Sequence, residues 1–365
     1  MRFIVCVTFV LLCAPGFSRS KAVAKSEKKG KGRYVERLRH KENNYIFSNE
    51  QAEQKSVIEK FGMLVKSSAK AIGAITFKKV PYSRGKMLYI GGKEEKLTFL
   101  KDYMKLPFTV ITEGILNMEL LTTADLNVAM LYNRQLKTPI KVFKVLDPKT
   151  ASKMYKTPTT KFLDQSFKDY GILQGIKDLF LKNAKGLHKG HLLAARLSTE
   201  DETAYSESYT FFNVVPMFPK FNVEVYRQME RKLLKFIGEA AEAEEEVYVM
   251  ASVSPVCQVN DQNGFLSVEK VSNLDWLGTP QEGVVIPRSI SVIAYSVPKS
   301  KMGKIKVFAW VGNNDKDSPK GYFPIDLTEL IPYFERNGDL STLNGITALE
   351  KTGYEMRQGY TTPFL

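Results

Sequence analysis

The sequence predicts a mixed α/β domain of the α+β class, built on a central antiparallel sheet. Two observations support this class. Short runs rich in β-branched and aromatic residues alternate with turn residues, and one long stretch carries apolar residues at helical spacing. No internal repeat and no linker rich in Pro, Gly or Ser divides the chain. We therefore expect a single domain over residues 46–365.

The first residues have the composition of an export signal. Arg2 precedes an almost wholly apolar run from Phe3 to Cys13, and Ala14-Pro15-Gly16 follows as a small-residue exit. Because a bilayer-spanning helix needs roughly 20 apolar residues, a secretory signal peptide over residues 1–18 fits better than a membrane anchor. No later stretch is long and apolar enough to span a membrane. We expect a secreted, extracellular protein without a transmembrane segment.

The positions of the cysteines exclude a disulfide framework. Cys6 and Cys13 lie in the predicted signal peptide, which leaves Cys257 alone in the mature chain. A chain of this length can bury enough apolar surface without cross-links. Cys257 ends an apolar run that is typical of a buried strand, so a packed small hydrophobic residue is favoured over a reactive thiol.

The charge of the chain favours a polyanionic partner. The formal net charge is +14, from 53 basic and 39 acidic side chains, which suits nucleic acid, sulfated polysaccharide or an anionic membrane. Ten basic and two acidic residues lie between Arg19 and Lys41, with almost no aromatic residues. We predict a disordered basic arm over residues 19–45, acting either as a solubilising tail or as a phosphate-binding arm.

The remaining elements are predicted from hydrophobic periodicity. Helices are expected over Asn49–Ala71, from Asn222 to about Glu245, and over Leu327–Phe334 with Asp326 as the N-cap. The predicted strands are short apolar or alternating runs: Ala74–Phe77, Met87–Ile90, Phe108–Thr112, Asn127–Tyr132, Ile140–Val145, a strand beginning at Val247, Val284–Pro287, Ser291–Tyr295 and Ile305–Val311. A turn is expected at Asn260–Gly264.

The small number of histidines limits the choice of a general base. The chain has three, and His40 lies in the predicted arm, which leaves His188 and His191. Gly190 allows a close backbone approach just before His191, and Leu192-Leu193 can pin the ring from the other side. A histidine so placed can take the proton from an attacking water, because its ordinary pKa lies near neutral pH.

Asn222 allows two interpretations. Its position before a long amphipathic helix favours a capping asparagine. Alternatively, its amide oxygen is a ligand for a hard cation such as Mg²⁺, which accepts few protein ligands and keeps several waters. Glu230, eight residues further on, is then either a solvated helix carboxylate or a hydrogen-bond partner for one of those waters.

Other classes of site have no matching motif. The sequence contains no G-x-x-x-x-G-K-[ST] phosphate loop, no H-E-x-x-H pair and no cysteine–histidine cluster for zinc. The run Asn313–Asp317 ends a predicted strand, and a turn explains it better than a calcium loop.

Around His191 and Asn222 the chain resembles the DNA/RNA non-specific endonucleases, which are ββα-metal nucleases of the His-Me finger group. In their first signature, Asp-Arg-Gly-His, Gly190 and His191 match, while His188 and Lys189 replace the aspartate and the arginine. In the second signature Met217 stands where glutamine is expected, and the matching residues are Asn213, Pro216, Phe221, Asn222 and Glu230. The core motif covers residues 186–237, and the resemblance extends over about 128–326.

The resemblance implies a two-layer ββα-metal domain that hydrolyses phosphodiester bonds in DNA and RNA with Mg²⁺ or Mn²⁺. It implies that His191 activates water and that Asn222 holds the ion. Glu230 and Asn213 are implied to order the metal-bound waters and the site. The side chains expected to bind nucleic acid are Lys189, Arg227, Arg231, Lys156 and Lys161. The chain is also similar to secreted arthropod salivary and gut members of the family.

Two departures from the family pattern favour an alternative function. Lys189 keeps the charge of the expected arginine but loses its two-pronged hydrogen bonding to phosphate. Met217 lacks the amide of glutamine, so the polar network around Asn213 must be rebuilt or lost. The alternative is a secreted nucleic-acid-binding protein on a nuclease fold, with weak or lost catalysis. Binding to heparin-like polysaccharide or to an anionic membrane surface is a third hypothesis, based on charge alone.

Overall fold

The computed structural model describes residues 77–79, 88–106, 111–123, 128–153, 179–180, 186–198, 208–262, 265–300 and 303–357. All of them belong to one compact unit, Ile72–Leu365. The predicted signal peptide, the basic arm and the helix Asn49–Ala71 lie outside the described residues, as do His40, Lys156 and Lys161. The corresponding expectations, and the domain boundary at residue 46, stay predictions.

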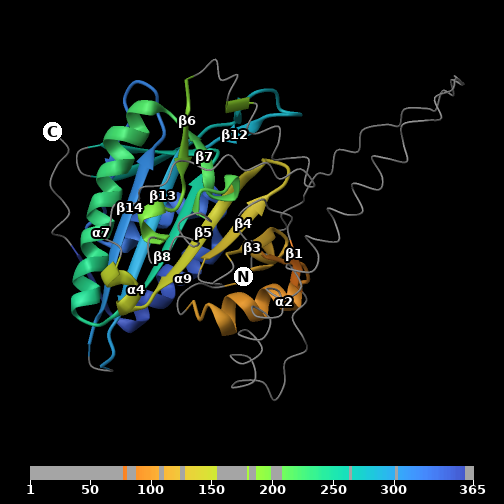
Figure 1. Cartoon of the computed structure of the whole chain (residues 1–365). Helices are drawn as coiled ribbons and strands as arrows, with labels where there is room; N and C mark the ends of the chain where they lie inside the picture. Colours follow the sequence, from red (N-terminus) through yellow and green to blue (C-terminus); the bar gives the residue numbers. More distant parts are fainter. Residues whose placement is uncertain are drawn as a thin grey trace, which may run out of the picture. The chain divides into compact units, whose positions relative to one another are not determined.

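A large antiparallel sheet forms the centre of the described fold (Figure 1). Its strands follow one another in the order β1 (Phe77–Lys79), β2 (Leu88–Ile90), β3 (Glu119–Thr122), β4 (Val128–Asn133), β5 (Thr138–Leu146), β8 (Glu246–Ser254), β13 (Ser289–Val297), β14 (Ile305–Asn313) and β15 (Gly321–Tyr322). Every neighbouring pair on this path is antiparallel. A short strand, β16 (Tyr354–Met356), adds a parallel pairing with β14. The structure thus confirms the predicted α+β class and its central antiparallel sheet.

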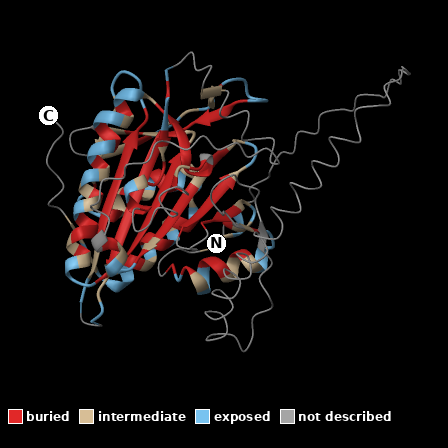
Figure 2. Cartoon of the chain, in the orientation of Figure 1, coloured by how far each residue is buried: buried red, intermediate tan, exposed pale blue. Residues whose placement is uncertain are grey.

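The middle of the sheet is buried on both faces. Every residue of β8 after Glu246 is buried, as is every residue of β13 before Val297. Figure 2 shows this as a red block running through the central strands. Side chains on both faces of a strand must be apolar or hydrogen-bonded when both faces are covered. This is why the sequence of these strands reads as nearly continuous apolar runs.

One face of the sheet is covered by η5 (Phe221–Tyr226), a short π-helical segment, and by α7 (Arg227–Glu242), which continues it. The large apolar side chains that α7 buries recur three or four residues apart: Met229, Leu233, Phe236 and Ile237. Phe236 packs against Phe308 of β14, with ring centroids 6.0 Å apart. Burying a side chain of this size contributes about 1.5–3 kcal/mol of transfer free energy, so the helix is held firmly on the sheet.

The opposite face is covered by α8 (Ile331–Asn337) and α9 (Leu340–Thr352). In Figure 1, α7 lies in front of the sheet and α9 behind it. Thr342 of α9 contacts the sulfur of Met250 in β8 at 3.7 Å. The residues on either side of Met250 point the other way, into the core beneath α7. The described fold therefore has three layers, one more than the family resemblance implies.

The predicted helix Leu327–Phe334 is present as two consecutive helical segments. It begins as a short 3₁₀ helix, η6 (Leu327–Leu330), and continues as α8. Asp326 accepts a hydrogen bond from the backbone N–H of Thr328, and the Glu329 carboxylate accepts one from the backbone N–H of Asp326. Such a capping box satisfies two amides that the first turn leaves unpaired. The predicted cap is confirmed.

The other described elements are short. The helical ones are α2 (Lys93–Thr98), η1 (Phe99–Tyr103), α3 (Glu113–Leu116), α4 (Pro148–Lys153), η3 (Ala195–Ser198) and η4 (Phe211–Asn213). The two-stranded sheets pair β6 (His188–His191) with β7 (Val214–Met217), β9 (Cys257–Gln262) with β10 (Phe265–Lys270), and β11 (Asp275–Leu277) with β12 (Val284–Ile286). Among these described helices none has the length and apolar composition needed to cross a membrane.

Several local predictions are tested by these short elements. Gln262 pairs with Phe265, so the chain reverses within the predicted turn region. Cys257 is fully buried and free, which confirms its interpretation as a packed small residue. The predicted strand Phe108–Thr112 fails for its two described residues, 111 and 112, which precede α3 and are not in a strand.

Candidate active site

The hairpin formed by β6 and β7 delivers His191. Its register pairs His188 with Met217, Lys189 with Pro216, Gly190 with Val215 and His191 with Val214. A Cβ on Gly190 would overlap the side chain of Met217, which is completely buried. The glycine therefore lets the methionine pack directly on the backbone beside His191. Met217 fills this space as an apolar residue, where the family pattern has a glutamine.

Asn213 anchors the chain just beyond His191. Its Oδ1 accepts a hydrogen bond from the N–H of Leu193 at 2.8 Å, and its Nδ2 donates to the carbonyls of Leu193 and Ser208 at 2.9 and 3.0 Å. Its own carbonyl accepts from the N–H of Leu192 at 2.7 Å. Asn213 is 1% exposed, so these bonds replace the water that its amide loses. The polar network around Asn213 is thus rebuilt with backbone partners.

His191 is held in a largely apolar environment. Its ring meets the ring of Tyr209 edge to face, with centroids 4.5 Å apart, and its Nε2 is buried. The next residues, Leu192 and Leu193, are buried. Burial disfavours the charged imidazolium and lowers the pKa of His191 to about 4. At neutral pH the imidazole is uncharged and can accept a proton, although a lowered pKa also makes it a weaker base.

Tyr226 ties the helix layer to the histidine strand. Its hydroxyl donates a hydrogen bond to the carbonyl of Leu192 at 2.5 Å. Its ring lies 5.7 Å from that of Trp310 in β14, and the ring of Phe221 lies 6.2 Å from the same tryptophan. This aromatic cluster holds η5 against the sheet and so places η5 next to Leu192.

Asn222 lies inside η5 and is not the N-cap of the helix. Residues 219 and 220 are already helical, and the N–H of Asn222 donates to the carbonyl of Phe218 at 2.9 Å. The capping interpretation was wrong because the helix begins before Asn222. The Asn222 side chain is turned toward β6, where its Nδ2 lies 3.3 Å from Nδ1 of His188. π-Helical segments often occur at functional sites, and here one presents an amide at the open end of the hairpin.

Glu230 lies further along the helix, on its partly buried side. Burial raises the pKa of Glu230 to about 7, while the positive charges of Arg196 and Arg227 oppose that shift. Arg196 follows the histidine strand on η3, and Arg227 opens α7. Glu230 is therefore not the freely solvated helix carboxylate that the sequence left as one interpretation. It is a partly buried carboxylate under the electrostatic influence of two basic side chains.

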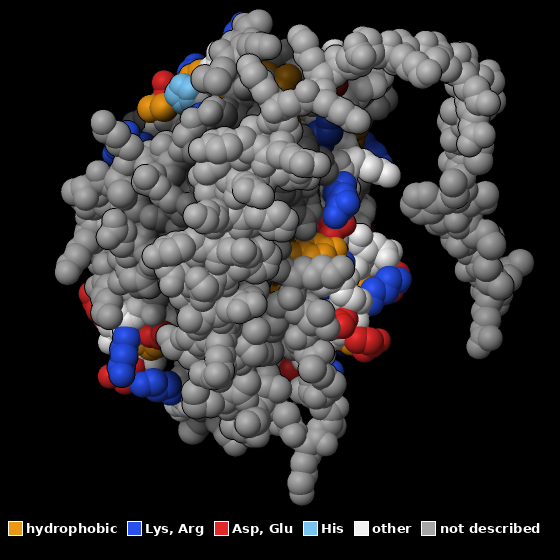
Figure 3. Space-filling view, turned by 45° about the vertical axis from the view of Figure 1, so that its right-hand side comes forward, with side chains coloured by type: hydrophobic (Ala, Val, Ile, Leu, Met, Phe, Trp, Pro, Cys, Tyr) orange, Lys and Arg blue, Asp and Glu red, His pale blue; other side chains and the backbone are white. Residues whose placement is uncertain are grey.

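The described side chains predicted to bind nucleic acid are on the surface. Lys189, Arg227 and Arg231 are all exposed, as is His188. In Figure 3 histidine reaches the molecular surface beside basic, acidic and hydrophobic side chains. Lys189 is next to His191 on β6, and the two arginines lie one helical turn apart on α7. The structure thus places basic groups on both elements that carry the candidate catalytic residues.

The sequence placed Asn314 in a turn after a strand but did not indicate its role, which is to fix the end of the hairpin where Pro216 lies. Its Nδ2 donates to the carbonyls of Pro216 and Pro287 at 3.0 and 2.9 Å, and its Oδ1 accepts from the N–H of Phe218 at 2.9 Å. The predicted turn after β14 is present, since Asp315 accepts from two later backbone N–H groups. A local pattern cannot reveal that the neighbouring Asn314 reaches β7 across nearly a hundred residues.

The residues at this site fit a hard divalent cation. Asn222 offers an amide oxygen and Glu230 a carboxylate, which are the oxygen donors that Mg²⁺ prefers. Within the described ranges no cluster of three or more His, Cys, Asp or Glu side chains could hold a metal ion. The donor set at Asn222 instead suits an ion that keeps most of its waters.

Comparisons with known proteins identify the family of the chain. The sequence model of the family described as DNA/RNA non-specific endonuclease matches residues 120–352. No curated protein matches the chain. A chain from the structure described as "Crystal structure of the EndoG/EndoGI complex: Mechanism of EndoG inhibition" is 16% identical, with a TM-score of 0.45, covering 66% of this chain and 89% of that one. Since the family match spans more than half of the sequence, the chain belongs to the DNA/RNA non-specific endonuclease family.

Proposed function

We propose that the chain is a divalent-cation-dependent endonuclease that hydrolyses phosphodiester bonds in both DNA and RNA without sequence preference. One observation carries this proposal, which is that Leu192 joins the three parts of the site. Its N–H donates to the carbonyl of Asn213, its carbonyl accepts from Tyr226, which lies on η5 as Asn222 does, and it directly follows His191. The candidate base and the segment that carries the proposed metal-binding amide are thereby tied to one residue.

His191 is the proposed general base. Its neutral imidazole takes a proton from water, the water oxygen bonds to phosphorus, and a phosphorus–oxygen ester bond breaks. Asn213 is a positioning residue, because it holds the backbone of Leu192 and Leu193 and so fixes where the His191 ring lies. The Tyr209 ring limits the rotation of the imidazole from the side.

Asn222 is the proposed protein ligand for Mg²⁺ or Mn²⁺, and Glu230 orders the water around it. When bound, the cation supplies positive charge that stabilises the leaving oxygen and the extra charge on the phosphate. Arg196 and Arg227 hold positive charge beside Glu230. Lys189, Arg227 and Arg231 are proposed to contact substrate phosphates, with Lys189 acting as a single point charge rather than a two-pronged donor.

The test is cleavage of plasmid DNA and of a long single-stranded RNA by the purified chain. Both should be cut with Mg²⁺ or Mn²⁺ and spared with a chelator, and His191→Ala should lose at least about a hundredfold in rate. Lys299→Ala is a matched control, because it removes one exposed charge that pairs with Glu244 away from the site. Intact substrate at micromolar protein would reject the proposal.

A second function is favoured by the low pKa of His191. A base with a pKa near 4 is weak at neutral pH, which suits a protein that binds nucleic acid tightly and cleaves it slowly. Binding would then need no metal and would weaken steeply with salt, because lysine and arginine release counterions from phosphates. A mobility-shift series in chelator, from low to high salt, measures this. Binding that is insensitive to salt would reject it.

We also propose that the protein is exported, on the basis of the signal-like residues 1–18. Expression in a secreting eukaryotic host should place the chain in the medium with a new N-terminus near residue 19. Edman sequencing of the secreted product tests this directly. Retention of the full-length chain inside the cells would overturn it.

A further inference from the structure

His188 and Asn222 meet at the open end of the β6–β7 hairpin. Nδ1 of the His188 imidazole lies 3.3 Å from Nδ2 of the Asn222 amide, and the imidazole is exposed. His188 stands where the family resemblance expects an aspartate. An asparagine N–H that points at a histidine nitrogen needs that nitrogen to carry a lone pair, so His188 Nδ1 is an acceptor in this arrangement.

We propose that His188 is a second protein ligand of the cation held by Asn222. The inference rests on the proposed function, which makes Asn222 the metal-binding residue. Turning the Asn222 amide by half a turn brings its oxygen, in place of Nδ2, next to His188 Nδ1. Two donors on neighbouring positions around a cation with bonds of about 2.1 Å lie about 3.0–3.4 Å apart. The observed 3.3 Å between the two side chains is within this range.

A nitrogen ligand changes which metal the site prefers. Mg²⁺ accepts oxygen donors and gives up its waters reluctantly, whereas Mn²⁺ and the later transition metals accept imidazole readily. An aspartate at this position would add a hard, charged oxygen and favour Mg²⁺. The exchange of aspartate for His188 therefore shifts the preference of this chain from Mg²⁺ toward Mn²⁺ and softer ions.

The local structure allows His188 to act in this way. The hairpin pairing to Met217 fixes the backbone of His188, and the exposed ring can move by small rotations without disturbing the core. Asn222 is equally constrained by its backbone bond to Phe218. Both donors thus come from fixed backbones, which limits the entropy lost when an ion binds.

Metal binding without catalysis tests the inference. The full chain carrying His191→Ala serves as the reference, and Mn²⁺ and Mg²⁺ are titrated separately by calorimetry. Adding His188→Ala should weaken Mn²⁺ binding by about tenfold or more and Mg²⁺ binding by less than about threefold. His188→Asp should recover Mg²⁺ binding and not the preference for Mn²⁺. Equal effects on both ions, or no effect, would overturn the inference.

A spectroscopic readout identifies the ligand itself. Pulsed electron paramagnetic resonance of the Mn²⁺-loaded reference should show coupling to an imidazole nitrogen, and His188→Ala should remove it. An unchanged nitrogen signal, or no signal in the reference, contradicts the inference. Asn222→Ala separates the two proposals. If it abolishes metal binding while His188→Ala changes nothing, only this inference fails; if it leaves both ions bound, the metal site of the proposed function fails too.

Discussion

Gly190 determines how closely the two strands beneath His191 can pack. The space that a side chain of Gly190 would take is filled by the side chain of Met217, which is fully buried. The pairing of β6 with β7 fixes the backbone of His191 opposite Val214. Gly190 therefore matters here because its missing side chain leaves room for Met217, and not because of its backbone freedom.

Gly190→Ala should destabilise the fold by about 1–3 kcal/mol, because an added methyl group overpacks a filled site. Urea denaturation measures the change in the free energy of unfolding. Gly114→Ala is the matched control, since a Cβ there meets only the Thr112 hydroxyl at an ordinary 3.6 Å. In Gly190→Ala/Met217→Ala the combined loss should be smaller than the sum of the two single losses. Strict additivity would show that the overlap is not the cause.

The pH dependence of cleavage follows from the environment of His191. Burial lowers its pKa to about 4, and the base must be uncharged to take a proton. The neutral form therefore dominates at neutral pH. In a Glu230→Gln background, which lacks the carboxyl group whose pKa is about 7, kcat/KM should stay level down to about pH 5 and fall below pH 4. A pH–rate profile at saturating metal measures this. An acid limb near pH 6.5, the ordinary value for histidine, would contradict it.

At the level of elements, η5 matters because it couples the helix layer to the hairpin. Its π-helical winding places Asn222 toward β6 and Tyr226 toward the carbonyl of Leu192. Phe221 and Tyr226 share the ring of Trp310. A displacement of η5 would therefore move the Asn222 amide and strand β6 together, so their relative position would be kept.

Tyr226→Phe removes the hydroxyl that bonds to Leu192 and leaves a buried carbonyl without that partner. The expected loss is about 1–3 kcal/mol of stability, with a fall in kcat larger than any change in KM. Thermal denaturation and cleavage kinetics measure both. Tyr132→Phe is a matched control, because its buried hydroxyl meets no hydrogen-bond partner within the described structure. Equal losses of stability and kcat in the two variants would show that Tyr226 has no positioning role.

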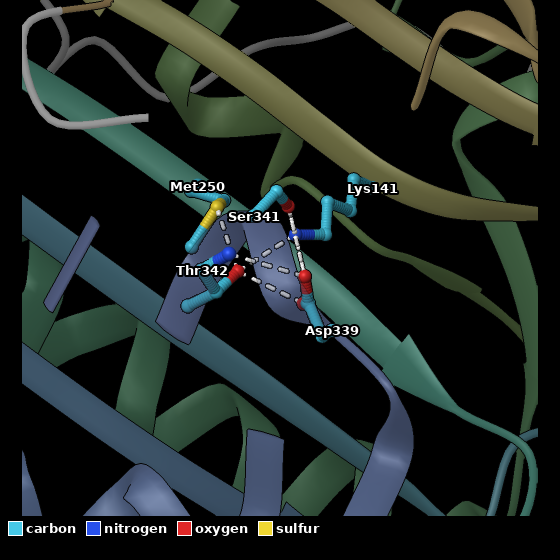
Figure 4. A network of polar contacts seen from close by, with 5 residues as sticks. All are labelled: Lys141, Met250, Asp339, Ser341 and Thr342. Carbon is cyan, nitrogen blue, oxygen red and sulfur yellow. Dashed lines mark hydrogen bonds and ion pairs between the residues drawn. The ribbon is translucent and has the colours of Figure 1, made fainter. Parts of the chain in front are cut away.

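At the level of the whole molecule, a buried polar network joins the third layer to the sheet (Figure 4). Lys141 of β5 donates to Asp339 at 2.5 Å and to the hydroxyls of Ser341 and Thr342 at 2.6 Å each. Burial would raise the pKa of Asp339, but the charge of Lys141 and the hydrogen bonds from Lys141, Ser341 and Thr342 together outweigh it and hold that pKa below its ordinary range. The network is on the sheet face opposite the candidate active site.

Asp339→Asn should cost about 3–5 kcal/mol of stability, because it leaves the Lys141 charge buried without its counterion. Because the folded pKa of Asp339 is lowered, the stabilisation is present above its ordinary pKa and is lost as the pH falls through the lowered value. Denaturation at neutral and acidic pH measures both effects. Breaking the exposed Lys93–Glu113 pair with Lys93→Met is the control and should change little. If Asp339→Asn left the free energy of unfolding unchanged, the role of the Lys141–Asp339 pair would be refuted.

The sequence predicted the features that depend on local spacing. Gly190 allows the close backbone approach expected just before His191, Glu230 follows Asn222 by about two helical turns, and Asp326 caps its helix as expected. The cap at Asn222 failed because a helix can begin earlier than its first strong polar residue indicates. Asn314 could not be predicted, because its partners lie far away in the sequence.

Helix α9 of the third layer was missed for a similar physical reason. It carries serine, threonine and glycine among its apolar residues, so its amphipathic pattern is weak in the sequence. Besides its buried Ile346 and Leu349, the contact of Asp339 with Lys141, almost two hundred residues away, holds it in place. Periodicity detects elements that bury a broad apolar face; it does not detect an element fixed by a few long-range polar bonds.

The burial of Cys257 has a consequence for how the motions of this protein can be observed. Its sulfur is enclosed, burial raises the pKa of its thiol, and its backbone bonds to Ser254 and Ser289. A thiol in this state reacts with a disulfide reagent only when the surrounding strands open. The rate of its labelling therefore reports the opening equilibrium between β8, β9 and β13, and comparing that rate with and without bound nucleic acid measures how far a substrate stiffens the sheet.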